Sequence, residues 1–349
     1  MALHDAQFGA LFELQSAPGV IAPGLLGFAQ SPPASVNAVN GTVFGDANSG
    51  VGGSGLDLTV NRVADEAATV TGSLTRKFDS FIRAGIATFS YSFPIAGNKA
   101  ITTGTPVDSE FLLDPGVDAI YQACGLTPIV PGPAAGTQYD CAGTVPITGL
   151  VYDSGVQYLL FDMQGSIALA FNVGGIGIAT ATFTGKVDLN ETVLATFPAT
   201  FLYGDQDQVA SPVVESVGNQ FGPTRGFSEL TVTVDNAINE TEDSNAVDGL
   251  RIEQESRNVN VAMTIDSDDS TPDFDFNNLV TTISRTDSMF FQVGTVNAGT
   301  EPAVSYKPTL TNMNIQDLTP AQPSKSKANT LTAVCTATTS GDEFKILFN

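Results

Sequence analysis

The residues whose types could support catalysis or metal binding are three cysteines and one histidine. Cys124, Cys141 and Cys335 form no Cys-x-x-Cys pair, and His4 is the only histidine among 349 residues. A structural zinc centre takes four ligands, mostly Cys and His, and this spacing supplies no such set. A Ser-His-Asp triad would depend on His4, and no Gly-x-Ser-x-Gly elbow supports a nucleophile. We therefore expect no catalytic residues, no cofactor-binding residues and no metal ligands, and we expect that the protein is not an enzyme.

Two loops match ligand-binding patterns but lack the context that those patterns need. Residues 50–55 match Gly-x-Gly-x-x-Gly, but a strand pattern follows them where a dinucleotide site requires a helix. Residues 266–273 are rich in Asp, yet they lack the turn glycine and the final Glu of an EF-hand loop. We interpret the first loop as a flexible linker and the second as a solvated loop.

A short amphipathic helix is predicted over residues 114–126. Asp114 can cap it, Pro115 suits its first turn and Gly125 ends it. Its apolar stripe, at positions i, i+3, i+4 and i+7, consists of Val117, Ile120, Tyr121 and Cys124. The stripe predicts that one face of the helix lies on a sheet and that its cysteine is a packed thiol.

Strand patterns account for most of the chain after residue 55. Apolar and polar residues alternate with period two in residues 56–61, 89–93, 166–173, 230–235 and 259–265, and the last strands run to Phe344, Ile346 and Phe348. The 34 glycines and 19 prolines favour short strands joined by turns. A second amphipathic stripe, in residues 271–283, predicts another helix. The predicted fold class is all-β with two short flanking helices.

The order of these elements predicts three segments. Residues 1–54 lack periodicity and read as an N-terminal arm with a flexible connection. Residues 55–197 and 198–349 each read as strands, a helix and further strands, which suggests an internal duplication. The alternative is one such unit followed by a decorating domain.

The charge balance limits the classes of partner. Lys and Arg total 14 against 37 Asp and Glu, a formal net charge of −23, and the basic residues are scattered along the sequence. Tight nucleic-acid binding depends on clustered Lys and Arg, so it is not expected. We find no signal peptide and no apolar run long enough to cross a bilayer, and the unpaired thiols suit a reducing cytoplasm.

Several segments resemble the major tail tube proteins of long-tailed, siphovirus-type bacteriophages. These segments are the helix of residues 114–126, residues 151–155 and 164–169, the hairpin of residues 245–250 with the strand that contains Arg257, and the closing strand of residues 341–348. The resemblance runs from about residue 56 onward. It implies tail-tube-like β-sandwich or barrel units, two per chain if the duplication is real.

The resemblance also implies a function. It is that of a virion structural protein, made in the cytoplasm of a bacterial host, whose stacked rings form the tail tube that conducts the genome. Two units per chain favour trimeric rings with pseudo-sixfold symmetry, and one unit would give hexamers. Tape-measure, tail terminator and distal tail proteins are the expected partners, while DNA passes through the lumen without specific binding and no membrane is involved.

Further expectations concern contacts and alternatives. Strand edges and the N-terminal arm, with Phe8, Leu11 and Phe12, are expected to supply assembly contacts, and the acidic excess is expected to be partly lumenal. The alternative functions are a distal tail or baseplate ring component, and a β-sandwich adhesin or carbohydrate-binding module.

Overall fold

The computed structural model describes most of the strands and one helix of the chain. The described residues are 8–23, 56–69, 77–95, 115–129, 137–153, 156–172, 177–188, 192–193, 214–216, 227–246, 249–266, 286–293, 306–321, 328–337, 339 and 341–348. The predicted helix of residues 271–283, the Gly-rich linker of residues 50–55 and His4 lie outside them. The same is true of residues 267–273, which form nearly all of the acidic loop.

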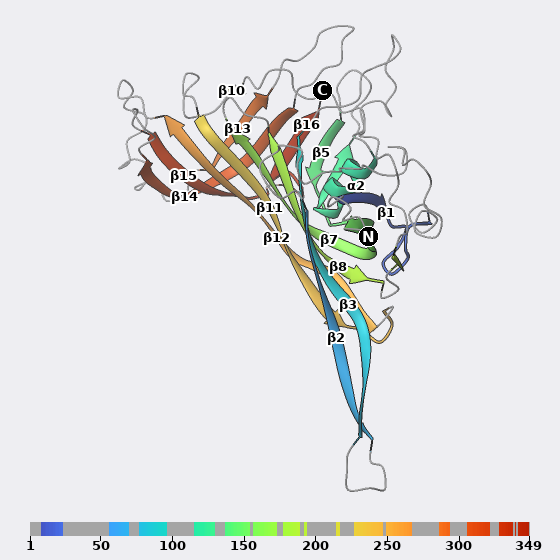
Figure 1. The fold of residues 1–349 in the computed structure, drawn as a ribbon. Helices are drawn as coiled ribbons and strands as arrows, with labels where there is room; N and C mark the ends of the chain where they lie inside the picture. Colours follow the sequence, from blue (N-terminus) through green and yellow to red (C-terminus); the bar gives the residue numbers. More distant parts are fainter. Residues whose placement is uncertain are drawn as a thin grey trace, which may run out of the picture.

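The described residues form an all-β fold, as the sequence predicted, with one of the two predicted helices among them (Figure 1). The helix is α2 (Pro115–Ala123). The strands are β1 (Phe8–Leu14), β2 (Leu56–Thr69), β3 (Lys77–Pro94), β4 (Leu126–Ile129), β5 (Thr137–Cys141), β6 (Ile147–Asp153), β7 (Val156–Asn172), β8 (Ile178–Val187), β9 (Thr192–Val193), β10 (Val214–Ser216), β11 (Phe227–Glu242), β12 (Leu250–Asp266), β13 (Thr286–Val293), β14 (Tyr306–Ala321), β15 (Ala328–Cys335) and β16 (Phe344–Phe348).

These strands join in one antiparallel sheet. Its main order is β2-β3-β8-β7-β11-β12-β15-β14-β16-β5-β4, with β1 and β6 attached beside β7 and with β10 and β13 attached beside β14. The sheet crosses the predicted boundary between residues 197 and 198 twice, because β7 pairs with β11 and β5 pairs with β16. The division into two units and an arm stays a prediction.

Alternation along the strands builds one apolar face, as predicted. On β7, Ile167, Leu169 and Phe171 are buried, whereas Asn172 is exposed. Successive side chains of a strand point to opposite faces, so each strand contributes every second residue to the core. The same pattern buries Val232 and Val234 of β11, Val259 and Val261 of β12, and Phe344, Ile346 and Phe348 of β16.

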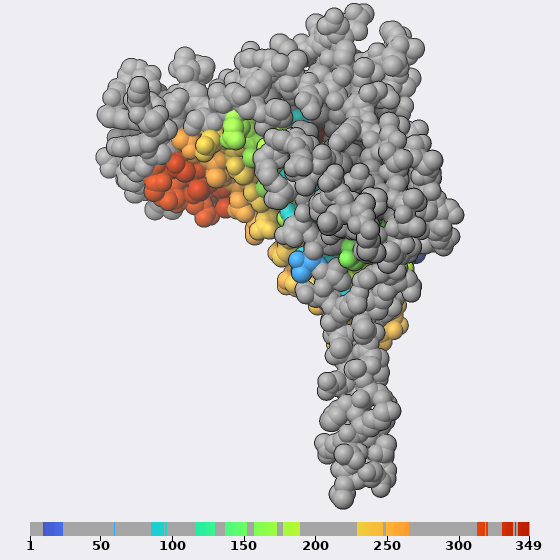
Figure 2. Space-filling model, in the orientation of Figure 1, coloured from blue at the N-terminus to red at the C-terminus, as the bar shows by residue number. Residues whose placement is uncertain are grey.

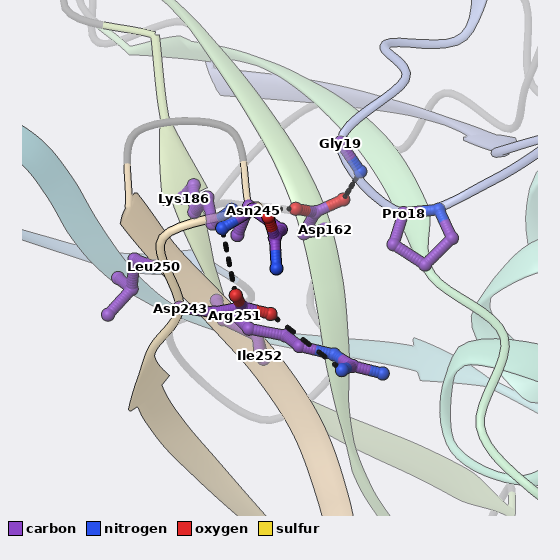
Figure 3. Close-up of a pocket in the computed structure, with 10 residues that line it drawn as sticks. Pro18, Gly19, Asp162, Lys186, Asp243, Asn245, Leu250, Arg251 and Ile252 are labelled. Carbon is purple, nitrogen blue, oxygen red and sulfur yellow. Dashed lines mark hydrogen bonds and ion pairs between the residues drawn. The ribbon is translucent and has the colours of Figure 1, made fainter.

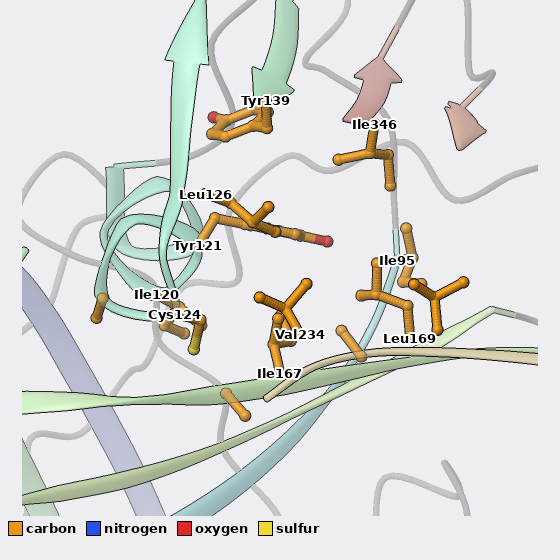
Figure 4. Close-up of a cluster of buried hydrophobic side chains, with 14 of the residues drawn as sticks. Ile95, Ile120, Tyr121, Cys124, Leu126, Tyr139, Ile167, Leu169, Val234 and Ile346 are labelled. Atoms are coloured by element: carbon orange, nitrogen blue, oxygen red, sulfur yellow. The ribbon is translucent and has the colours of Figure 1, made fainter. Parts of the chain in front are cut away.

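Helix α2 packs its predicted stripe into this core (Figure 4). Val117, Ile120, Tyr121 and Cys124 are all buried, and the helix contacts β1, β4, β6 and β7. Gly125 follows the helix with φ of +81°, a left-handed conformation that glycine adopts without strain. The predicted helix, its end and its packing against the sheet are confirmed, while Asp114 lies outside the described residues.

Aromatic side chains connect the sheet with the elements that cover it. Phe12 lies 5.9 Å from Phe89 between ring centroids, and Tyr121 of α2 lies 5.3 Å from Tyr139 of β5. Burying a large apolar side chain of this kind contributes roughly 1.5–3 kcal/mol to folding.

The N-terminal strand belongs to this core, which corrects one expectation. β1 pairs with β6 over its whole length, and Leu11 and Phe12 are fully buried within the chain. Side chains buried in this way have no surface left for contact with another subunit. The expectation that Leu11 and Phe12 supply assembly contacts is therefore wrong for this fold, because the β6 edge and the aromatic cluster already use them.

Candidate self-assembly surface

Strands β2 and β3 continue beyond the sheet as a two-stranded ribbon (Figure 1). β3 pairs with β8 only from Gly85 to Pro94, whereas its pairing with β2 reaches Lys77. Among the described residues, β2 pairs with β3 alone, and no described strand lies along its other edge over its 14 residues. An open edge presents a row of unpaired backbone groups that can accept a strand from another chain.

A second ribbon is formed by β11 and β12. β11 pairs with β7 only from Glu229 to Val234, and β12 pairs with β15 only from Val259 onward. Residues 235–258 therefore have no further strand neighbour among the described residues. The turn of this ribbon includes Gly249, whose φ is +69° and whose carbonyl accepts a 3.0 Å bond from the amide of Asp243. The hairpin predicted at residues 245–250 is confirmed.

Asn236 anchors the base of the β11–β12 ribbon to the core. Its buried amide group donates to the carbonyl oxygens of Cys124, at 2.8 Å, and Gly165, at 2.7 Å. Its side-chain oxygen accepts a 2.7 Å bond from Gln254 on β12. One side chain thus connects the end of α2, strand β7 and both strands of the ribbon.

A second set of polar contacts continues this anchor. Thr144 donates its hydroxyl to Gln164 at 2.6 Å and its amide to Gln254 at 3.0 Å. Gln164, which is buried, donates to the carbonyl of Ile252 at 2.9 Å. Buried polar groups are stable only when they are hydrogen-bonded, so these bonds favour one position of the ribbon over others.

The tip of the ribbon meets β7, β8 and the segment after β1 around a cavity of about 250 Å³ (Figure 3). Inside it, the ammonium of Lys186 lies 3.0 Å from the carboxylate of Asp162, and both side chains are almost fully buried. Asp162 has φ of 53° at a bulge of β7 and accepts a 2.5 Å bond from the amide of Gly19. The pair therefore joins three parts of the chain.

The charges that line the cavity are already paired with one another. Arg251 lies 3.9 Å from Asp243 and also forms an ion pair with Glu253. The Asp162–Lys186 pair is buried, whereas Arg251 and Glu253 are exposed and their pairs contribute little to stability. Together the pairs leave little unbalanced charge with which to bind a substrate. The cavity is best described as a structural junction.

An ion pair also ties the C-terminal strand to the ribbon. The Nε of Arg257 donates to Glu343 at 2.7 Å, and its guanidinium also donates to the carbonyl of Ala142. Lys345 of β16 lies 3.5 Å from Asp140 of β5. The strand containing Arg257 thus contacts the segments around β5 and β16, far away in sequence.

The three cysteine thiols are buried, and their surroundings disfavour the reactive thiolate form. Burial raises the pKa of Cys124 well above its ordinary value, and burial followed by the charge of Glu343 raises the pKa of Cys141 and of Cys335 to about 12. The Cys124 thiol lies 3.4 Å from the carbonyl oxygen of Ser166. The prediction that Cys124 is a packed thiol is confirmed, and within the described ranges no three His, Cys, Asp or Glu residues form a possible metal group.

These anchors were not predicted from the sequence. Asn236 and Gln254 are separated by 18 residues and Arg257 and Glu343 by 86, and no local spacing rule links such pairs. A single polar residue at an apolar-period position of a strand, as Asn236 is on β11, was the one available signal.

No protein-family model matches the chain, and no curated protein matches it in sequence. Within the described part of the chain, no helix is both long and apolar enough to span a membrane.

Proposed function

We propose that the protein is a virion structural subunit whose rings stack into a phage tail tube, a conduit for genome delivery. The observation that carries the proposal is the sheet, which joins both halves of the chain and ends in β2, a strand with no second neighbour among the described strands. Sheets with long open edges associate, and closure of a ring through edge-to-edge pairing leaves no edge free. The resemblance of residues 56–349 to tail tube proteins adds to this argument.

The partners and location follow from the same proposal. We propose a trimeric ring with pseudo-sixfold symmetry, to which each chain contributes two units; a hexamer with one unit per chain is the alternative. Tape-measure, tail terminator and distal tail proteins are proposed partners in the virion tail. The net charge of −23 supports passage of DNA without specific binding.

Electron microscopy of the purified protein tests the proposal. Stacked hollow rings are the expected result, and the symmetry of end-on views separates trimers from hexamers. Single rings that never stack would support the distal tail or baseplate alternative instead. Dispersed monomers would contradict ring assembly, and binding to a glycan array would then favour the adhesin or carbohydrate-binding module.

A further inference from the structure

The face of the sheet opposite the core carries small polar side chains. On β8, Ala181 and Phe183 are buried, while Thr182 between them is exposed. On β11, Val232 is buried and its neighbours Thr231 and Thr233 are half-buried. Period-two alternation therefore gives β8 and β11 the same arrangement, apolar inward and hydroxyl outward.

These outward positions align across five strands. In register, Ser92 of β3 pairs with Thr180 of β8, Thr180 with Ala168 of β7, Ala168 with Thr233 of β11, and Thr233 with Asn260 of β12. At about 4.8 Å between strands, this row spans about 19 Å. We call the surface around it, made by the outward residues of β3, β8, β7, β11, β12 and β15, the hydroxyl face.

The hydroxyl face is almost free of charge. At its described positions, two carboxylates occur, Glu229 and Asp235, and neither Lys nor Arg occurs in residues 86–92, 178–184, 166–172, 229–235, 258–264 and 330–334. The Asp235 carboxylate accepts a 3.3 Å bond from the hydroxyl of Ser166 on the neighbouring strand. By contrast, the β11–β12 ribbon exposes Glu240, Glu242, Glu253 and Glu255.

This composition is typical neither of a tight protein–protein interface nor of a nucleic-acid-binding surface. Tight protein interfaces are anchored by large aromatic side chains and Arg, and nucleic-acid-binding surfaces need Lys and Arg for phosphate. The described outward positions of the hydroxyl face supply none of these. Figure 2 shows that described residues of β11, β12 and the C-terminal strands, coloured yellow to red, reach the molecular surface. Hydroxyl groups there can hold water.

This inference rests on the proposed tube: we propose that the hydroxyl face lines the bore and that its described positions present water-binding hydroxyls and no Lys or Arg to the genome. In a ring, every residue is repeated around the axis, and stacking repeats it along the axis. One Lys per chain would become a lattice of phosphate-binding sites, whereas the carboxylates of Glu229 and Asp235 hold no phosphate. Hydroxyl groups add no such binding sites, so DNA can pass along them.

Cysteine labelling of assembled rings tests this assignment. In a Thr233→Cys variant, the introduced thiol is the only reactive one, because the three native thiols are buried. Assembled rings and dissociated chains are each treated with N-ethylmaleimide or with a maleimide carried on a long polyethylene glycol. We expect the rings to react with the small reagent alone and the dissociated chains to react with both. The unsubstituted protein is the control and reacts with neither.

Each other outcome contradicts the inference in a different way. Equal reaction of rings with both reagents places the hydroxyl face on the outside of the ring, and protection from both buries it against another copy. Ala168→Cys, in the same row, is a second reporter if Thr233→Cys fails to assemble. If rings form but react with both reagents or with neither, the assignment of the hydroxyl face to the bore is wrong and the proposed function stands. If the unsubstituted protein forms no rings, the proposed function is wrong as well.

Discussion

At the scale of single residues, stability of the proposed assembly surface depends on a few buried polar side chains. Asn236 is the clearest case, since its side chain forms three hydrogen bonds to groups on three other elements. Removing a polar side chain from such a site costs more than the bonds contribute, because its partners are left buried and unpaired.

Replacement of Asn236 by Ala is expected to lower the free energy of unfolding by about 3 kcal/mol, because the carbonyls of Cys124 and Gly165 lose their donor. Urea denaturation measures this change. Asn239→Ala is the matched control: Asn239 is on the same strand, exposed, and bonded to Glu255 at the surface. Its expected effect is less than about 0.5 kcal/mol, and equal effects for the two variants would refute the anchoring role of Asn236.

The Asp162–Lys186 pair should show strong coupling. Asp162→Asn keeps a residue that tolerates the left-handed backbone but removes the negative charge beside the buried Lys186, and Lys186→Met removes the positive charge beside the buried Asp162; each change is expected to cost about 3–5 kcal/mol. The double variant should be far more stable than the sum of the two losses implies. A double-mutant cycle in urea measures the coupling free energy, and additive losses would mean that the pair does not act as a unit.

The three thiols should react only after unfolding. At pH 8 they are protonated in the folded protein, because burial raises the pKa of Cys141 and Cys335 to about 12 and that of Cys124 well above its usual value. A thiol-reactive chromophore is expected to show negligible reaction with the native protein and reaction of all three cysteines in guanidinium chloride. Rapid reaction of any thiol in the native protein would show that it is accessible, contrary to its burial.

At the scale of elements, local sequence patterns were enough to predict which side chains are buried wherever one face of an element packs against the core. Ile167, Leu169 and Phe171 show this for strands, and the stripe that includes Ile120 and Tyr121 shows it for α2. β1 was missed because residues 8–14 are buried by pairing with β6, more than 130 residues away in sequence. The polar anchors of the candidate assembly surface were not predicted for the same reason. They join elements that are distant in sequence and become neighbours only in the folded sheet.

The docking of β1 can be tested through Phe12. Its ring is fully buried and lies within 6.1 Å, between centroids, of Phe89, Tyr91 and Phe183. Phe12→Ala is expected to lower the free energy of unfolding by about 3–5 kcal/mol, because a cavity replaces the ring. Val20→Ala, at an exposed position of the same N-terminal segment, serves as the control and is expected to have little effect. Similar small effects for both would show that β1 is not part of the core.

At the scale of the whole molecule, the continuous sheet separates the two kinds of polar surface. The hydroxyl face carries mostly hydroxyl groups, with two carboxylates at its described positions, while the β11–β12 ribbon exposes Glu240, Glu242, Glu253 and Glu255. In the proposed tube, the first surface faces the passing genome and the second is free to contact solvent or other subunits. A charge placed on each surface should therefore have different consequences for DNA.

Thr233→Lys introduces a cation into the hydroxyl face, and Ser244→Lys introduces one into the exposed turn of the ribbon. Co-sedimentation of assembled rings with short duplex DNA should show retention by the first variant at low salt and its loss as salt rises, because phosphate binding releases counterions. The unsubstituted protein and Ser244→Lys are expected to retain little DNA. Equal retention by both variants would contradict the placement of the hydroxyl face in the bore.

The position of β16 sets an order on the folding of the chain. This strand, residues 344–348, lies between β14 and β5, and its inward side chains are fully buried. β5 is synthesised some 200 residues before β16, with which it pairs, so the sheet of a nascent chain is incomplete until β16 has been made. Contacts this distant in sequence form slowly. Each chain therefore completes the pairing of β5 and β14 with β16 only after residue 348 has been synthesised.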